Sequence, residues 1–276
     1  MANIIFLWKK SVRDKRARSI RYEERKKLNY EIIKIGVSAS LLAGLATGIG
    51  ALPVLFIKKI SDRTLDIMLG FAAGVMLAAS SFSLLVPALD LGGVWVTSIG
   101  LALGAATIHL IDRFAPHEHF IAGPEGPSSK LSRLWLFIIA ITIHNFPEGM
   151  AVGVSFGGGD VQRGLTIALA IALQNIPEGL AVAFPLVREK YSRVKALWYA
   201  TLTGLVEPIG GLFGAAMVSI ARPILPWGLA FAAGAMIFVV SDEMIPESHR
   251  KGFESEATFG LVVGFIVMML LDNLMG

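Results

Sequence analysis

The chain repeats one polar phrase inside two apolar stretches, thirty residues apart. Residues 144–149 read His-Asn-Phe-Pro-Glu-Gly, and residues 174–179 read Gln-Asn-Ile-Pro-Glu-Gly. Each copy places a carboxylate, one or two carboxamides and a proline inside a run long enough to cross a bilayer. Ionisable groups at membrane depth are costly, so we treat these side chains as functional candidates.

The spacing within each copy puts the polar side chains on neighbouring faces of one helix, because residues three or four positions apart are adjacent there. If the two helices pack together, six side chains converge: His144, Asn145, Glu148, Gln174, Asn175 and Glu178. Mixed nitrogen and oxygen donors suit a divalent first-row cation, and two close carboxylates with no basic neighbour would otherwise repel each other. A single copy could be an ordinary hydrogen-bonding site in a core, but the duplication favours a metal site.

The composition predicts an all-α polytopic membrane protein. Of the 276 residues, 54% are hydrophobic and only 17% are charged, against about a quarter in soluble domains. The chain has no cysteine, which excludes disulfides and a thiolate metal site. The basic residues lie at the edges of apolar stretches, so the high isoelectric point is no sign of nucleic-acid binding.

Eight transmembrane helices are expected after a basic N-terminal tail at residues 1–29, within a transporter domain at 30–276. The expected spans are 32–57, 65–89, 93–114, 133–156, 164–187, 194–220, 223–246 and 256–274. Frequent glycines in these spans would allow close helix packing.

Lysine and arginine counts set the expected orientation, because cytoplasmic loops are enriched in these residues. The connections after spans 1, 3, 5 and 7 hold twelve Lys or Arg, and those after spans 2, 4 and 6 hold only Arg163 and Arg222. We therefore expect a cell (inner) membrane protein with a cytoplasmic 115–132 loop and both termini extracytoplasmic. The tail, with ten Lys or Arg between Lys9 and Lys27, points the other way.

A second repeat relates two further spans. Residues 71–76 read Phe-Ala-Ala-Gly-Val-Met, and residues 231–236 read Phe-Ala-Ala-Gly-Ala-Met. In both repeats the two expected helices run in opposite directions. This favours an inverted-repeat transporter of three spans, a central pair and three spans, with its site near the midplane.

The paired phrase resembles the signature of the ZIP (Zrt-/Irt-like) divalent-metal transporters, in particular their bacterial GufA-like branch. The resemblance runs from about residue 35 to the C-terminus. It implies zinc uptake into the cytoplasm through a binuclear-type site, and it adds Glu207 and Met76 as ligands. It also implies that spans 1, 4, 5 and 6 move against a scaffold of spans 2, 3, 7 and 8. One departure is Asn175, where some relatives carry an acidic residue or another ligand.

Other polar residues mark candidate ends of the ion's path. Ser83, Asp90 and Asp272 would form an outer inlet, and Asp112, Asp242 and Glu243 an inner outlet, with simple interfacial capping as the alternative for the inlet residues. We expect Zn2+ as the transported substrate, with Fe2+, Mn2+ or Cd2+ as further substrates. Expected partners are divalent metal ions, the lipid bilayer and, as a homodimer, a second copy of the chain, but no nucleic acid.

Two other functions compete with a carrier. A passive metal-selective channel would use the same residues. An intramembrane metalloenzyme would need an open coordination position and a general base, and the usual His-Glu-x-x-His phrase is absent. We therefore expect no enzyme. The sequence also has no nucleotide-binding P-loop, so we expect gradient-driven transport.

Overall fold

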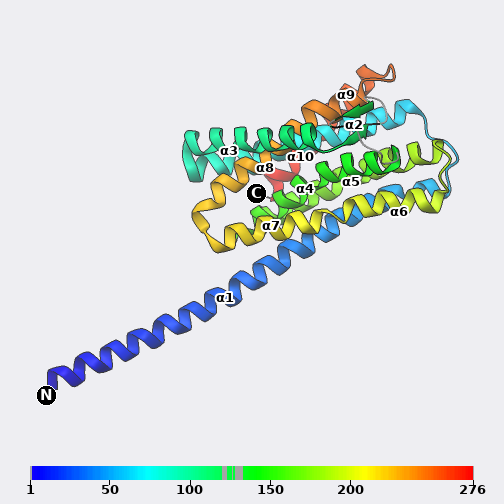
Figure 1. Ribbon diagram of the computed structural model, residues 1–276. Coiled ribbons are helices and arrows are strands. Elements are labelled where there is room, and N and C mark those ends of the chain that lie inside the picture. The colour runs from blue at the N-terminus through cyan, green and yellow to red at the C-terminus, as the bar shows by residue number, and fades with distance from the viewer. Residues whose placement is uncertain (1, 120–122, 126, 128–132, 276) are drawn as a thin grey trace.

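The structure is a computed structural model that describes residues 2–119, 123–125, 127 and 133–275. It is built almost wholly from helices, as expected (Figure 1). In chain order they are α1 (Ala2–Ala51), the short 3-10 helix η1 (Leu52–Leu55), α2 (Asp62–Ala78), the π-helical η2 (Ala79–Leu85), α3 (Val86–Phe114), α4 (Arg133–Gly157), α5 (Val161–Arg188), α6 (Arg193–Gly204), α7 (Glu207–Ile220), η3 (Arg222–Ile224), α8 (Leu225–Val239), the π-helical η4 (Val240–Met244), α9 (Ile245–Ser248) and α10 (Glu254–Met275).

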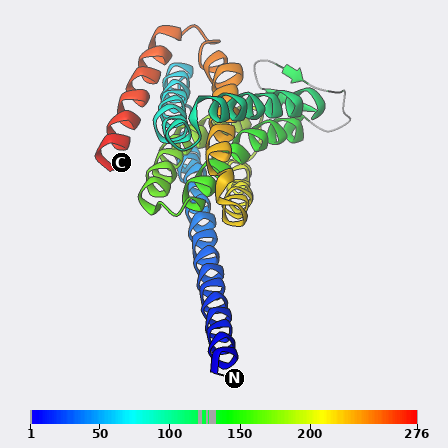
Figure 2. The same cartoon turned by 90° about the vertical axis from the view of Figure 1, so that its left-hand side faces the viewer.

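One short hairpin departs from the all-α prediction. Within the 115–132 segment, β1 (His117–His119) and β2 (Gly123–Glu125) pair antiparallel, with His117 opposite Glu125. The pairing supplies partners for backbone N–H and C=O groups once the chain has left α3. The hairpin stands to one side of the helices (Figure 2).

Prolines and capping side chains explain several helix limits. The side chains of Ser61, Asp160 and Ser192 accept hydrogen bonds from backbone N–H groups in the first turns of α2, α5 and α6. The expected span 194–220 is divided: α6 ends at Gly204 and α7 begins at Glu207, because Pro208 cannot donate to the carbonyl four residues earlier. By contrast, α4 and α5 continue through the prolines of the repeated phrase.

Six helical segments of the described chain are long and apolar enough to cross a membrane: Lys26–Leu55, Asp62–Phe114, Val161–Arg188, Arg193–Ile220, Arg222–Ser248 and Glu254–Met275. Asp62–Phe114 has 53 residues, more than twice the ~20 that a single crossing needs. Gly93, with φ 73° and ψ 176°, interrupts it at the first residue of the expected span 93–114. The expected span 133–156 coincides with α4, which has 25 residues.

The helices form two bundles, which we name by their members. The motif bundle contains α1, α4, α5, α6 and α7: α4 packs on α7, and α1 packs on the other four. The outer bundle contains α2, α3, α8, α9 and α10: α2 packs on α10, and α3 packs on α8. The two bundles meet mainly where α2 contacts α5 and where α4 contacts α8. Figure 1 shows the outer bundle above the motif bundle.

The outer bundle has an internal repeat that extends beyond the matched hexapeptides. Each hexapeptide is followed a few residues later by a π-helical segment, η2 in one case and η4 in the other. The carbonyl oxygen of Leu261 occupies the space where Gly74 would carry a side chain. The carbonyl oxygen of Leu101 does the same at Gly234, 160 positions after Gly74. The same offset relates Ser83 to Glu243 and Asp112 to Asp272. The helix pair α2–α10 is therefore built like the pair α8–α3.

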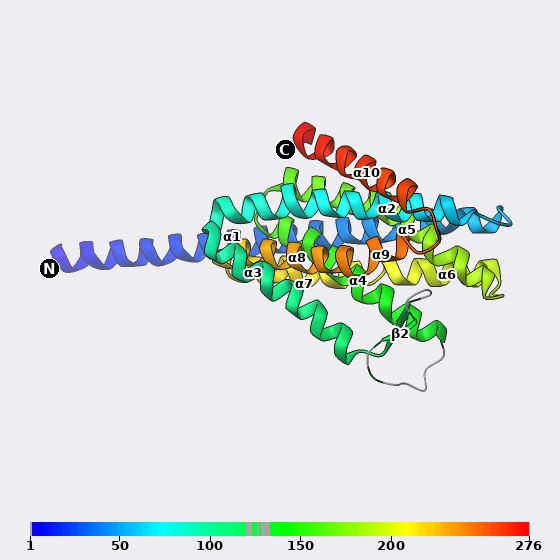
Figure 3. The ribbon, with the colours of Figure 1, turned by 90° about the horizontal axis from the view of Figure 1, so that it is seen from above.

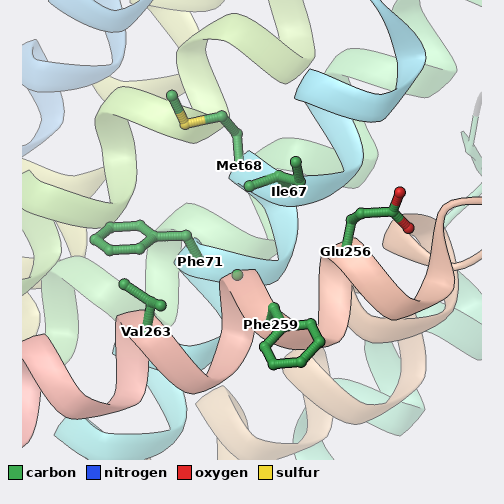
Figure 4. Close-up of a pocket in the computed structure, with 7 residues that line it drawn as sticks. Ile67, Met68, Phe71, Glu256, Phe259 and Val263 are labelled. Carbon is green, nitrogen blue, oxygen red and sulfur yellow. The ribbon is translucent and has the colours of Figure 1, made fainter.

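The outside of the molecule carries many large apolar side chains, as expected of a chain surrounded by lipid. Helix α10 lies at the edge of the bundles, and only 17% of its most apolar window is buried within the protein (Figures 2 and 3). A shallow groove of about 330 Å³ runs between α2 and α10 (Figure 4). Its lining is apolar except at one end: Ile67, Met68, Phe71, Phe259, Gly260 and Val263, with Glu256 beyond them.

The connections after α1, α3, α5 and α9 carry most of the basic loop residues, and we call this end of the molecule the basic end. Helix α1 runs toward it without a break from Ala2. At its other end α1 extends far beyond the remaining helices (Figures 1 and 3). The expected 1–29 tail is thus continuous with the first span as one helix.

Candidate metal site between the paired motifs

The two repeated phrases lie on helices α4 and α5, and the glycine that ends each phrase sets how closely another helix approaches. A Cβ atom on Gly149 would stand 2.0 Å from the carbonyl oxygen of Glu207 in α7. A Cβ atom on Gly179 would stand 2.0 Å from the carbonyl oxygen of Thr47 in α1. Any side chain there would push the partner helix away. The Pro-Glu-Gly order therefore couples each carboxylate to a close helix contact.

The three intramembrane glutamates converge, as the sequence reasoning expected of two of them and the resemblance implied for the third. Glu148 and Glu207 are fully buried, and Glu178 is 9% exposed. Glu148 lies within electrostatic range of Glu178 and Glu207, and Glu207 within range of Glu178. Glu207 reaches this position because the α6–α7 break places it at the first residue of α7.

Carboxamides surround these carboxylates. The side-chain amide of Asn175 donates to Oε1 of Glu207 at 2.6 Å and to the carbonyl oxygen of Ala43 at 2.8 Å. Asn145 and Gln174 are fully buried beside them. Asn175, the departure from the family pattern, thus acts as a donor to a carboxylate.

Much of the polar capacity of this cluster has no hydrogen-bond partner among the described residues. The unpartnered buried atoms are both side-chain polar atoms of Asn145, Oδ1 of Asn175 and Oε2 of Glu207. The carboxylate of Glu148 and the amide of Gln174 lie beside each other without a hydrogen bond of good geometry. Buried polar atoms left unsatisfied cost free energy, and native proteins contain few of them. Such a concentration at the junction of α4, α5 and α7 is the arrangement that a cation, with its ligands converging from several helices, would satisfy.

The candidate ligands do not yet stand close enough together to coordinate an ion as a group. Within the described residues, no three His, Cys, Asp or Glu side chains stand in metal-ligating geometry. A bound ion would therefore draw the carboxylates together or take carboxamide oxygens into its shell.

His144 lies at the contact between the bundles. Its Nε2 shares a hydrogen bond with Oε2 of Glu243, which lies in the π-helical η4 of the outer bundle. Glu178 and Asp112 also lie within electrostatic range of the imidazole. The structure thus joins one expected ligand, His144, to two expected outlet residues.

The other expected residues are placed less closely. Met76 is fully buried in the apolar cluster that also holds Met236 and Met150, and its role as a ligand stays a prediction. Ser83 donates a hydrogen bond to Asp272, which joins two expected inlet residues. Asp90 and Asp242 are exposed, and among the described residues no hydrogen bond or ion pair joins them to these groups.

Sequence reasoning missed a polar cluster at the basic end. Asp66 in α2 is fully buried, and Lys251 lies 3.7 Å from its Oδ1. Arg188 at the end of α5 contacts Oδ1 of Asp62 at 2.6 Å and donates to the carbonyl oxygen of Ile60. The signal was an aspartate in the second position of the expected span 65–89, where an apolar residue is usual.

Comparison with known proteins bears on this arrangement. The family description "ZIP Zinc transporter" matches residues 122–272. The chain is 46% identical to the Zinc transporter GufA of Myxococcus xanthus over 251 residues, which covers 87% of this chain and 99% of that protein. It is 46% identical to the Zinc transporter ZIPB of Bordetella bronchiseptica over 266 residues, covering 88% and 83%. It is 38% identical to the Zinc transporter ZIP11 of Homo sapiens over 317 residues, covering 82% and 93%.

These relatives are transporters rather than enzymes, which removes the intramembrane metalloenzyme as an interpretation. They are similar over most of the chain, including both motif helices and the outer bundle. The chain therefore belongs to the ZIP family of transporters, and its apolar helices are those of a multi-pass membrane protein.

Proposed function

We propose that the chain carries zinc across the membrane, with the ion held between α4, α5 and α7. The observation that carries this proposal is the set of buried, unpartnered side-chain oxygen atoms at that junction. The relatives named above are zinc transporters by name. The proposed ligands are His144, Asn145, Glu148, Gln174, Asn175, Glu178, Glu207 and Met76, arranged as a binuclear-type site. Iron, manganese and cadmium ions are proposed as competing substrates.

The proposed topology has eight spans in a three, two and three arrangement. It is supported by the length of Asp62–Phe114 and its interruption at Gly93, by the separate helix α4, and by the 160-residue repeat of the outer bundle. We propose that the protein lies in the inner membrane of the cell. Its basic end would face the cytoplasm, and both termini would lie on the opposite side. Residues 1–29 are proposed as a separate basic tail region, although their helix is continuous with the first span.

The proposed path follows the two polar contacts of the outer bundle. An ion would enter near Ser83, Asp272 and Asp90, exchange its water for the ligands of the motif helices, and leave past His144 and Glu243, with Asp112 and Asp242 nearby. Uptake of this kind would require the motif bundle to move against the outer bundle. Carboxylates suit this work because they replace a dication's hydration shell without holding it as strongly as thiolates would. A homodimer is a further prediction.

Zinc uptake by purified protein in proteoliposomes tests the proposal. We expect saturable uptake, and counterflow when the vesicles are preloaded with zinc, because a carrier exchanges ions one cycle at a time. Glu148→Gln and Glu178→Gln each remove one buried carboxylate and should abolish uptake. The matched control is Glu31→Gln, which removes an exposed carboxylate of α1 outside the cluster and the proposed path and should leave uptake near that of the unchanged protein. Full uptake by a correctly inserted Glu148→Gln variant would refute the site, and flux without saturation or counterflow would indicate a channel.

A further inference from the structure

A buried carboxylate lies outside the motif helices, near the start of α2. The side chain of Asp66 is fully buried, and among the described residues its only cationic neighbour is Lys251, which stands too far away for a hydrogen bond of good geometry. Asp62 and Glu254 add negative charge nearby. A carboxylate in such surroundings persists only when a cation compensates it.

Lys251 supplies this cation, and it does so loosely. Its Nζ lies 3.7 Å from Oδ1 of Asp66 and 3.8 Å from Oδ1 of Asp62, both longer than the ~2.7–2.9 Å of a charge-assisted hydrogen bond. Asp62 already contacts Arg188 at 2.6 Å, so the compensation by Lys251 matters most for Asp66. Lys251 stands in the short connection between α9 and α10, directly before Gly252 with φ 90°. The ammonium is thus held by a loop and not by a rigid helix.

A line of carboxylates leads from the paired motifs to Asp66. Glu243 contacts His144, and Glu247 follows Glu243 by four positions along the chain. Glu247 lies within electrostatic range of Glu243 and Asp66 and of two cations, Lys251 and Arg250. An ion that leaves His144 toward the basic end would therefore meet Glu243, then Glu247, then Asp66. At Asp66 it would find the ammonium of Lys251 already in place.

We propose that Lys251 is a tethered counter-cation of the outlet, which competes with the departing ion for Asp66. The ammonium compensates Asp66 between ions, yields when a dication arrives, and on its return displaces that ion into the water beyond. The direction of travel rests on the proposed zinc uptake, whereas the cation site at Asp66 does not. Without the ammonium, Asp66 and Glu247 would retain the ion and release would become slow.

Initial rates of zinc uptake into proteoliposomes test this role. Lys251→Gln should lower the maximal rate and the KM by the same factor, about tenfold for a retention that is tighter by ~1.4 kcal/mol, because slow release limits turnover without changing loading. Lys251→Arg, which keeps the charge, and the double variant Lys251→Gln with Asp66→Asn should both restore the two constants. The matched control is Lys195→Gln, which removes an exposed lysine at the same end and should change neither constant.

Two results would overturn the proposal. A lower maximal rate with unchanged KM would mean that Lys251 only supports folding. In equilibrium zinc binding to the purified full-length protein, Lys251→Gln should bind one more zinc than the wild type, and Asp66→Asn in that background should remove it. Equal stoichiometry would reject the site at Asp66 whether or not the chain transports zinc. An extra zinc bound by a protein that shows no saturable uptake would reject the proposed transport and keep the site.

Discussion

The two bundles are held together internally by one kind of contact and held to each other by another. Within each bundle, glycines bring backbones together: Gly149 meets Glu207 in the motif bundle, and Gly104 meets Phe231 in the outer bundle. Across the described residues, every glycine whose added Cβ would fall within 3.0 Å of another helix's backbone does so inside its own bundle. Such contacts cannot slide, because a carbonyl oxygen occupies the space of each missing side chain.

Contacts between the bundles are made by side chains. Gly228 of α8 faces the methyl groups of Val154, and His144 faces Glu243. Side chains can change rotamer and partner, whereas interlocked backbones cannot. We infer from this difference that the two bundles behave as rigid bodies with one adaptable interface, and that the candidate ligands of the paired motifs belong to only one of them.

Disulfide cross-links test this division most severely, and the chain has no cysteine of its own. The Cβ of Val154 lies 3.9 Å from a Cβ placed on Gly228, across the bundles, and the Cβ of Ala215 lies 3.5 Å from one placed on Gly36, within the motif bundle. Both separations suit a disulfide. Oxidising the Val154→Cys, Gly228→Cys protein should stop zinc uptake, and a reductant should restore it.

The cross-link between Gly36→Cys and Ala215→Cys is the control, because it joins helices that we expect to move together. Uptake by this variant should survive oxidation. If the cross-bundle disulfide forms and uptake continues, the bundles do not need to move against each other.

Added methyl groups should give a smaller, graded effect. Gly149→Ala would place a Cβ 2.0 Å from a backbone oxygen, and overpacking of this kind costs about 1–3 kcal/mol or more. Gly228→Ala adds the same atom 3.1 Å from a methyl group of Val154, which can turn away. Thermal unfolding of the purified variants should show a clear loss of stability for the first and little change for the second. Equal losses would mean that the interface between the bundles is as rigid as their interiors.

Labelling of introduced cysteines from one side of the membrane tests the orientation of the two bundles. The two cysteine substitutions themselves should leave zinc uptake unchanged. Lys59→Cys lies in the connection from the motif bundle to the outer bundle at the basic end, and Asn273→Cys lies near the end of α10; both positions are exposed. An impermeant thiol reagent applied outside intact cells should reach Asn273→Cys, and Lys59→Cys only after permeabilisation. Labelling of both from one side would contradict the eight-span topology.

The sequence was most informative where chemistry and helical periodicity coincide. The spacing within 144–149 and 174–179 predicted which glutamates and carboxamides share a helix face, because positions on one face are set by local geometry alone. That the two faces meet was predicted only on the condition that the two helices pack together. The 71–76 and 231–236 match also predicted related helices. The same offset of 160 positions also relates Gly104 to Gly264 and Asp112 to Asp272. These further matches became apparent only once the structure showed which helices pair.

Other features depend on contacts between segments far apart in the chain. The partner of Asp66 comes from a loop 185 residues later, and no local pattern assigns Lys251 to it. The π-helical turns η2 and η4 depend on how their helices pack, so the periodicity of apolar residues in the sequence does not predict them. The pairing of β1 with β2 and the unbroken start of α1 were missed for the same reason: charged, irregular sequence leaves several backbone conformations open.

The unbroken helix α1 also makes small motions large. Fifty residues at 1.5 Å each give a rod of about 75 Å, against about 30 Å of hydrocarbon, so an arm of about 45 Å projects past the bilayer. For each degree that the motif bundle would tilt, the tip of such an arm would move by about 0.8 Å. Because α1 packs on the helices that carry the glutamates, a small tilt of those helices would appear as a larger displacement of its N-terminal end. If the motif bundle tilts during transport as we propose, a pair of probes on the tip of α1 and on the far end of α10 would detect the tilt from outside the membrane.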